Sequence, residues 1–227
     1  MAGDDGEVTR LLVNFYDTLA SGGMACIFLG HAYFHPAGKA HPKMTGLHRD
    51  SNIAGFKSLA DAIHKHNCVV FAQLNYAGSR IQKDFVEPVG PSAVTNPFSA
   101  ETARELHVSE IDEIINAFGQ AAGRAKQAGL DGILIHGGHG YLVSCFNSPY
   151  TNRRTDKWGR DPEARSLFIL KTFEAIRHTV GLDFPVMVKL GIRDDVEATI
   201  CLRMVLCRRP PCWVLFLAPS PRKVSGI

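Results

Sequence analysis

The chain has 227 residues, of which 45% are hydrophobic and 21% are charged, and its formal net charge is +3. This composition is ordinary for a globular protein, and so small a positive charge gives no reason to expect nucleic acid or an anionic membrane surface as a partner. The six cysteines are scattered without a CxxC spacing, which favours a reduced, cytoplasmic protein over a disulfide-stabilised one.

The first pattern along the chain is a helix followed by a buried strand. Residues 1–7 are acidic and polar, so we expect no signal peptide here. Residues 8–19 place apolar side chains at helical spacing, and two glycines stop the pattern. The apolar residues of this predicted helix face are Leu11, Leu12, Phe15 and Leu19. Residues 25–29 (ACIFL) then predict a buried strand that ends at Gly30.

Helix and strand patterns continue to alternate up to residue 190. A long, proline-containing loop interrupts them after the second strand. The helix that follows this loop is the clearest, because Ser109 can cap its start and Gly129 ends it. Two further helices are predicted over residues 52–66 and 164–180. The remaining strands are predicted over residues 68–74 (CVVFAQL), 132–135 (GILI) and 185–190 (PVMVKL).

The order of these elements predicts an α/β fold. Continuous apolar strands separated by helices are typical of a parallel sheet that helices cover. The order βαβαβαβ occurs both in open doubly wound sheets and in closed barrels, and periodicity does not distinguish the two. Neither GxGxxG nor GxxxxGK[ST] follows a predicted strand, so the phosphate-binding loops of two common nucleotide-binding folds are absent from the sequence.

The character of the sequence changes after about Asp195. Residues 196–227 are rich in cysteine, arginine and proline and have no amphipathic period, so we predict an irregular tail. Its longest apolar stretch, residues 213–218, is far shorter than the roughly 20 residues of a membrane-spanning helix. The spacing of its cysteines matches no common zinc site, so we predict no metal there.

Polar side chains follow the predicted strands at the ends where α/β barrels build their active sites. One strand ends in Gln73, and the next leads directly into His136, His139 and Tyr141. The last predicted strand carries Lys189. Because the carboxyl ends of parallel strands meet at one rim of a sheet, we expect these five residues to form one site.

Three motifs resemble the old yellow enzyme family of NADH:flavin oxidoreductases. Residues 121–132 (AAGRAKQAGLDG) run into the sequence IHGGHGYL, and SPYTNRRTD follows at residues 148–156. Residues 71–78 (FAQLNYAG) are similar to the Gln-Leu-x-His-x-Gly stretch of the family. The resemblance covers about residues 8–193. It implies a partial (β/α)8 TIM-type barrel that contains about strands two to five.

The resemblance implies FMN as the cofactor and NAD(P)H as the reductant, with three residues beside the flavin. Gln73 is similar to the glutamine that hydrogen-bonds the pyrimidine edge of the flavin. Lys189 occupies the position of a cation near flavin N1 and O2, where it would stabilise the anionic reduced flavin. Gly30 matches a small residue at a strand end, where a side chain would collide with the flavin.

The substrate implied by the resemblance is an α,β-unsaturated carbonyl compound. His136 and His139 look like the pair that binds the carbonyl oxygen and stabilises the developing enolate, while the flavin delivers hydride to the β-carbon. Tyr141 is similar to the tyrosine that protonates the α-carbon. A metal site at the two histidines is the competing interpretation, but the sequence offers no third ligand nearby.

Departures from the family leave a second and a third interpretation open. The first barrel strand should precede Val8, and the tail resembles none of the strands and phosphate-binding loops that should follow Lys189. We therefore divide the chain into a partial barrel domain, residues 8–195, and a non-homologous tail, residues 196–227. The second interpretation is an inactive fragment without stable flavin binding, because four strands cannot close a barrel of eight. The third is an aldolase that uses Lys189 to form a Schiff base.

Overall fold

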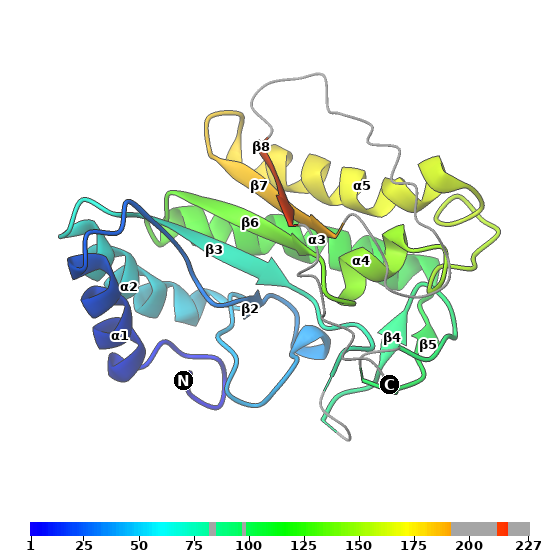
Figure 1. Cartoon of the computed structure of the whole chain (residues 1–227), viewed down its shortest axis with the longest axis horizontal. Coiled ribbons are helices and arrows are strands. Elements are labelled where there is room, and N and C mark those ends of the chain that lie inside the picture. Colours follow the sequence, from blue (N-terminus) through cyan, green and yellow to red (C-terminus); the bar gives the residue numbers. More distant parts are fainter. Residues whose placement is uncertain (82–84, 97–98, 192–212, 218–227) are drawn as a thin grey trace, which may run out of the picture.

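The computed structural model describes residues 1–81, 85–96, 99–191 and 213–217. Its main feature is a six-stranded parallel sheet (Figure 1). Five strands follow one another across this sheet: β1 (Cys26–Phe28), β3 (Val69–Asn75), β6 (Gly132–Gly137), β7 (Val186–Gly191) and β8 (Trp213–Leu217). The sixth, β2 (Ala32–Tyr33), pairs with the end of β3 on the same edge as β1.

Four long helices and one short helix accompany the sheet. They are α1 (Arg10–Ser21), α2 (Ile53–His64), α3 (Val108–Gln127), α4 (Leu142–Asn147) and α5 (Pro162–Val180). Figure 1 shows α1 and α2 beside the β1 and β3 side of the sheet, with α3 and α5 packed together behind β6 and β7. Two 3-10 turns (Pro36–Gly38 and Asp50–Asn52) and a small sheet of β4 (Val89–Gly90) and β5 (Arg104–Glu105) complete the described elements. No helix among the described residues is both long and apolar enough to cross a membrane.

The two faces of the sheet differ because side chains alternate along each strand. The residues that face the helices form the hydrophobic core, and they include Val70, Ala72, Leu74, Ile133, Ile135, Val186 and Val188. The intervening positions face the other side. Near the strand ends that side carries Gln73, Asn75, His136 and Lys189. Packing of the apolar face therefore holds these polar side chains on one common surface.

The four predicted strands are all confirmed, in parallel and in chain order across the sheet. The structure also contains strands that the sequence does not predict. β2, β4 and β5 have only two residues each, which is too short for a periodic pattern. Within the predicted irregular tail, residues 213–217 form β8 and pair with β7 from Met187 to Gly191. Residues 196–212 and 218–227 of the predicted tail lie outside the described residues.

Two local predictions about the helices are wrong. The apolar face predicted for α1 is largely exposed, since Leu11 is 70% and Phe15 55% exposed, while Tyr16 and Ala20 are the buried residues. The reason is that α1 lies at the edge of the helix layer and packs on α2 along one side only. Ser109 does not cap α3. The helix begins at Val108, two residues earlier than a Ser109 cap would place it, with His107 as its cap and Glu110 accepting the backbone N–H of His107.

The segment that connects α4 to α5 is organised around Arg154, whose side chain is only 7% exposed. The guanidinium donates to both carboxylate oxygens of Asp156 at 2.6–3.1 Å and to Glu105 at 3.0 Å. It also donates to the backbone carbonyls of Pro91 and Leu106 at 3.1 and 2.8 Å. One arginine of the motif SPYTNRRTD therefore joins three segments of the chain that are distant in sequence.

Candidate active site

His136, His139 and Tyr141 are brought together at the carboxyl end of β6. His136 is the fifth residue of β6, and the other two lie on the loop that leads to α4. The centroid of the His136 ring is 5.2 Å from that of His139 and 4.9 Å from that of Tyr141. The structure thus brings these three side chains next to one another, and their roles in a site stay a prediction.

The tautomer of His136 follows from its hydrogen bond within the turn. The backbone N–H of Gly138 donates to Nδ1 of His136 at 3.3 Å, so Nδ1 carries no proton and Nε2 carries it in the neutral ring. Burial, reinforced by the positive charge of Lys189, lowers the pKa of His136 to about 2. His136 is therefore a neutral imidazole with an Nε2–H donor at neutral pH.

His139 is held by an unusual backbone conformation. Its φ is +61°, in the left-handed region, and the next residue, Gly140, has φ +75°. The backbone carbonyl of His139 accepts a hydrogen bond from the guanidinium of Arg80. Burial, followed by the charges of Lys189 and Arg80, lowers the pKa of His139. The tight turn thus brings a second neutral imidazole back toward His136.

Tyr141 is the N-cap residue of α4, and its ring contacts both an imidazole and a guanidinium. The guanidinium carbon of Arg80 is 5.0 Å from the centroid of the Tyr141 ring, which is the range of a cation–π contact. The backbone carbonyl of Tyr141 accepts from the hydroxyl of Ser144 at 2.8 Å. These contacts fix the ring and its backbone.

Two further predicted residues, Gln73 and Lys189, present polar groups on the same face of the sheet. Lys189 pairs in register with His136, and Gln73 lies on the next strand, β3. Neither side chain forms a hydrogen bond or an ion pair with another residue of the described part of the chain. Burial lowers the pKa of the Lys189 ammonium. Both groups are therefore available to a ligand.

These groups suit the edge of a flavin ring, which offers carbonyl oxygens and one N–H. The amide of Gln73 can both donate and accept, and the ammonium of Lys189 can donate to a carbonyl oxygen. Asn75, on the same face, has a buried Oδ1 without a partner among the described residues. At Gly30 a Cβ atom would meet only the Tyr16 hydroxyl, at an ordinary 3.5 Å, so the packing of the chain itself does not require a glycine there.

The sequence prediction missed His31, which lies in the same cluster. Its ring centroid is 5.9 Å from that of His136 and 5.4 Å from that of Tyr141. Burial, followed by the charge of His41, lowers the pKa of His31 to about 4. The signal was present in the sequence, because His31 follows the predicted strand over residues 25–29 and so obeys the same strand-end rule as Gln73.

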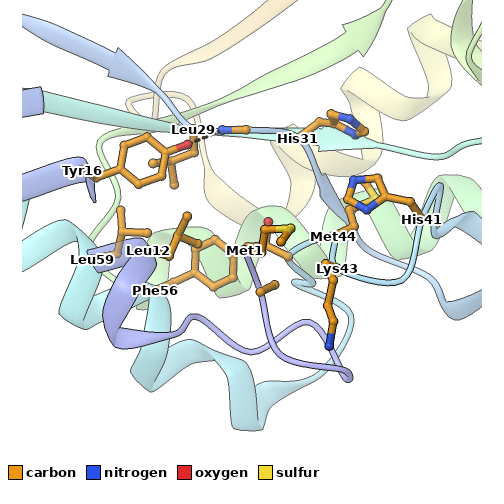
Figure 2. A pocket seen from close by; sticks show the side chains of 13 residues that line it. Met1, Leu12, Tyr16, Leu29, His31, His41, Lys43, Met44, Phe56 and Leu59 are labelled. Atoms are coloured by element: carbon orange, nitrogen blue, oxygen red, sulfur yellow. Dashed lines mark hydrogen bonds between the residues drawn. The ribbon is translucent and has the colours of Figure 1, made fainter. Parts of the chain in front are cut away.

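His31 also lines a cavity of about 160 Å³ between α1, α2 and the loop that follows β2 (Figure 2). Apolar side chains form much of its wall, and they include Leu12, Leu29, Phe56 and Leu59. Figure 2 shows His31 and His41 together at one side, with Lys43 nearby. The Tyr16 hydroxyl accepts the backbone N–H of Gly30 at 2.7 Å, which ties α1 to the start of this site.

The lowered pKa values of these histidines make the free energy of unfolding depend on pH. In the unfolded chain His31 and His136 take up protons below about pH 6.5, whereas the folded chain keeps them neutral down to about pH 4 and pH 2. The unfolded state then binds more protons, so the free energy of unfolding falls as the pH falls below 6.5. At pH 5 each histidine lowers it by at most about 2 kcal/mol, at about 1.36 kcal/mol per pH unit.

Urea unfolding at pH 7 and pH 5 measures this effect, and His136→Gln is the informative variant. Glutamine remains uncharged at both pH values, so part of the loss between pH 7 and pH 5 should disappear in that variant. An equal loss of stability in the variant and in the natural chain would show that His136 is not the group that titrates.

The chain was compared with known proteins. The model of the NADH:flavin oxidoreductase / NADH oxidase family matches residues 1–202. An NADH oxidase from Thermoanaerobacter brockii is 39% identical over 201 residues, which are 87% of this chain and 31% of that protein. An NADPH dehydrogenase from Clostridium acetobutylicum is 33% identical over 189 residues, which are 83% of this chain and 56% of that protein.

A solved structure shows the same likeness. The old yellow enzyme homologue from Zymomonas mobilis superposes with a TM-score of 0.79 and 25% identity, over 88% of this chain and 58% of that chain. The chain thus spans about a third to three-fifths of the length of these relatives. The family resemblance and the partial-barrel fold predicted from the motifs are confirmed. The chain belongs to the NADH:flavin oxidoreductase / NADH oxidase family, whose members use FMN with NAD(P)H as the reductant.

Proposed function

We propose that the chain functions as an FMN-dependent oxidoreductase that transfers hydride from NAD(P)H, by way of the flavin, to an α,β-unsaturated carbonyl compound. The observation that supports this most is the convergence of two neutral imidazoles and a phenol. His136 lies 5.2 Å from His139 and 4.9 Å from Tyr141, measured between ring centroids. An activity of this kind, which consumes NAD(P)H, fits the cytoplasmic location that the cysteine pattern predicts.

Gln73, Lys189 and Gly30 are the residues that would hold FMN. Gln73 and Lys189 offer hydrogen bonds to the polar edge of the ring, and Gly30 leaves room for the ring to approach the backbone. When bound, FMN supplies the hydride transfer between NAD(P)H and the β-carbon of the substrate. A fixed cation at Lys189 lowers the free energy of negative charge on a ligand beside it.

The histidines and the tyrosine act on the substrate. His136 donates its Nε2–H to the carbonyl oxygen, and His139 supplies a second donor, so negative charge that develops on this oxygen is stabilised. Donors of this kind typically contribute about 10²–10³ each to the rate of a reaction that forms an oxyanion. Tyr141, which contacts His136, transfers its phenolic proton to the α-carbon.

Two other functions have their own tests. The described strands form an open sheet, with β1 and β8 at its edges, and this favours the alternative of a fragment that does not retain FMN. Titration of the purified chain with FMN decides this, because stoichiometric binding contradicts the alternative. The lowered pKa of Lys189 fits a Schiff-base lysine of an aldolase. Trapping of a carbonyl substrate on Lys189 with borohydride would support that function instead.

The proposed oxyanion site is tested by the double variant His136→Ala, His139→Ala. Phenol, bound as the phenolate, places one negatively charged oxygen where the enolate oxygen would lie, so its affinity reports on the two donors. Loss of two hydrogen bonds to a charged oxygen, at about 1.5–3 kcal/mol each, should weaken phenol binding by at least about 100-fold. Calorimetry with FMN present measures it. The exposed His178→Ala is the matched control, and unchanged phenol affinity in the double variant would remove both histidines from the substrate site.

A further inference from the structure

His31 is positioned by an irregularity at the edge of the sheet. Phe28 pairs with Phe71 and Ala32 pairs with Leu74, so three residues of the first strand segment stand opposite two residues of β3. The extra residue makes the chain bulge between β1 and β2, and bulges of this kind often redirect a side chain next to an active site. The side chain of His31 comes from this bulge.

The bulge directs the His31 ring toward the described site. The ring contacts both His136 and Tyr141, at centroid distances of 5.9 and 5.4 Å. His31 therefore touches the oxyanion donor and the proton donor of the proposed reaction at the same time. A merely structural histidine would be expected to contact the core residues behind the sheet instead.

The tautomer of His31 is fixed by a neighbouring amide. Nδ2 of Asn75 is 3.1 Å from Nδ1 of His31, and an amide nitrogen can only donate, so Nδ1 is the acceptor. The proton of the neutral ring then lies on Nε2. Asn75 is completely buried on β3, which makes it a rigid support. His136 obtains the same tautomer from the backbone N–H of Gly138. Two imidazoles in ring contact are thus prepared in the same way as Nε2–H donors.

The charges around His31 favour an anion. The titratable groups that act electrostatically on His31 are Lys189, Arg80, His41 and His139. None of them is acidic, and Lys189 and Arg80 are the cations among them. Lys189 has no ion-pair partner among the described residues. A ligand that brings negative charge to this place therefore meets donors and cations and no described carboxylate that would repel it.

We infer that His31 is a third substrate-binding residue, which donates its Nε2–H to the second oxygen of a carboxylate and so selects α,β-unsaturated acids. The inference rests on the proposed function, in which His136 and His139 bind the first oxygen. A ketone has one oxygen, which two donors already satisfy, so the half-buried Nε2–H of His31 would have no second ligand oxygen to bind. A carboxylate has two oxygens and a full charge, and it uses all three donors.

The test compares two small probes, benzoate with two oxygens and phenol with one, on the full chain with FMN present. In His31→Phe the ring is kept and the donor is lost. We expect benzoate affinity to fall by about 10- to 100-fold, the usual effect of a hydrogen bond to a charged group, while phenol affinity changes less than about threefold. In His31→Gln, which retains an N–H donor, part of the benzoate affinity should return. Calorimetry gives both affinities without any need for turnover.

Asn75 is a positioning residue, and its role has a spectroscopic readout. In Asn75→Ala the proton of the His31 ring is no longer confined to Nε2, so the nitrogen chemical shifts of this ring should move toward a mixture of tautomers. Benzoate affinity should fall with them. Unchanged shifts in Asn75→Ala would show that the amide does not set the tautomer.

The outcomes separate this inference from the proposed function. If the double variant of His136 and His139 loses phenol but His31→Phe binds benzoate normally, the inference fails and the proposed function stands. If His31→Phe weakens phenol and benzoate equally, His31 only shapes the pocket, and the inference is again overturned. If neither probe binds the natural chain, both fail together.

Discussion

Reduction of an enone should slow by about 10²–10⁴-fold when Tyr141 is replaced by phenylalanine, the usual contribution of a general acid. Phenylalanine keeps the ring that contacts His136 and Arg80 and removes only the acidic O–H. Reduction of the flavin by NAD(P)H requires no proton from the protein at the substrate carbon. The rate of that half-reaction should therefore hardly change.

Stopped-flow measurement of the two half-reactions with FMN-loaded protein checks this prediction. Tyr150→Phe is the matched control, since Tyr150 lies on the following loop and contacts Arg153 instead of the histidines. Equal slowing of both half-reactions in Tyr141→Phe would mean that the hydroxyl shapes the pocket. If neither half-reaction slows, the proton comes from solvent or from another residue.

Replacement of Arg154 by alanine should lower the free energy of unfolding by about 1–3 kcal/mol, because the arginine side chain is buried and donates several hydrogen bonds, while its carboxylate partners are partly exposed and can be hydrated. The guanidinium holds Asp156, Glu105 and two backbone carbonyls, and its side chain is 7% exposed. In the variant these acceptors lose their donor. The hydrogen bond from Arg154 lowers the pKa of Asp156, so this carboxylate would lose the interaction that stabilises its charge.

Urea unfolding followed by circular dichroism at pH 7 measures the loss. The neighbouring Arg153 is exposed, and its side chain donates to the carbonyl of Tyr150 at 3.1 Å, while its backbone N–H, which alanine keeps, donates to Ser92. Arg153→Ala should therefore cost less than about 1 kcal/mol. A loss of similar size in the two variants would contradict the role assigned to Arg154. Arg154 would then contribute no more to the free energy of unfolding than an exposed arginine does.

The regular part of the fold was predictable because its central strands, β3 and β6, are buried on both faces and its helices are long. Residues 68–72 and 132–135 are runs without a polar side chain, and such runs leave a signal in the sequence itself. A two-residue strand such as β2 leaves none, because only its partner β3 defines it. The exposure of Leu11 and Phe15 could not be predicted from the sequence either, since it depends on the position of α1 in the helix layer.

The candidate site was predictable to the extent that its residues follow strands or match family motifs. His136, His139 and Tyr141 lie within eight residues of a predicted strand, and the structure gathers them. The place of His31 after a predicted strand could also have been read from the sequence. The direction of its ring could not, because it depends on Asn75, which is 44 residues away, and on a bulge that has no sequence signature. Arg154 was visible only as part of a motif. Its partners come from two other segments, and their proximity is a property of the tertiary structure.

The left-handed backbone of His139 limits which residues can replace it during evolution. Most L-amino acids pay about 1–2 kcal/mol in that conformation, whereas asparagine, aspartate and histidine adopt it several times more often than other residues with a side chain. Of these, only histidine and asparagine offer a neutral N–H donor. Substitutions at residue 139 should therefore exchange histidine and asparagine. The turn conformation then preserves an N–H donor even in sequences where the imidazole ring is lost.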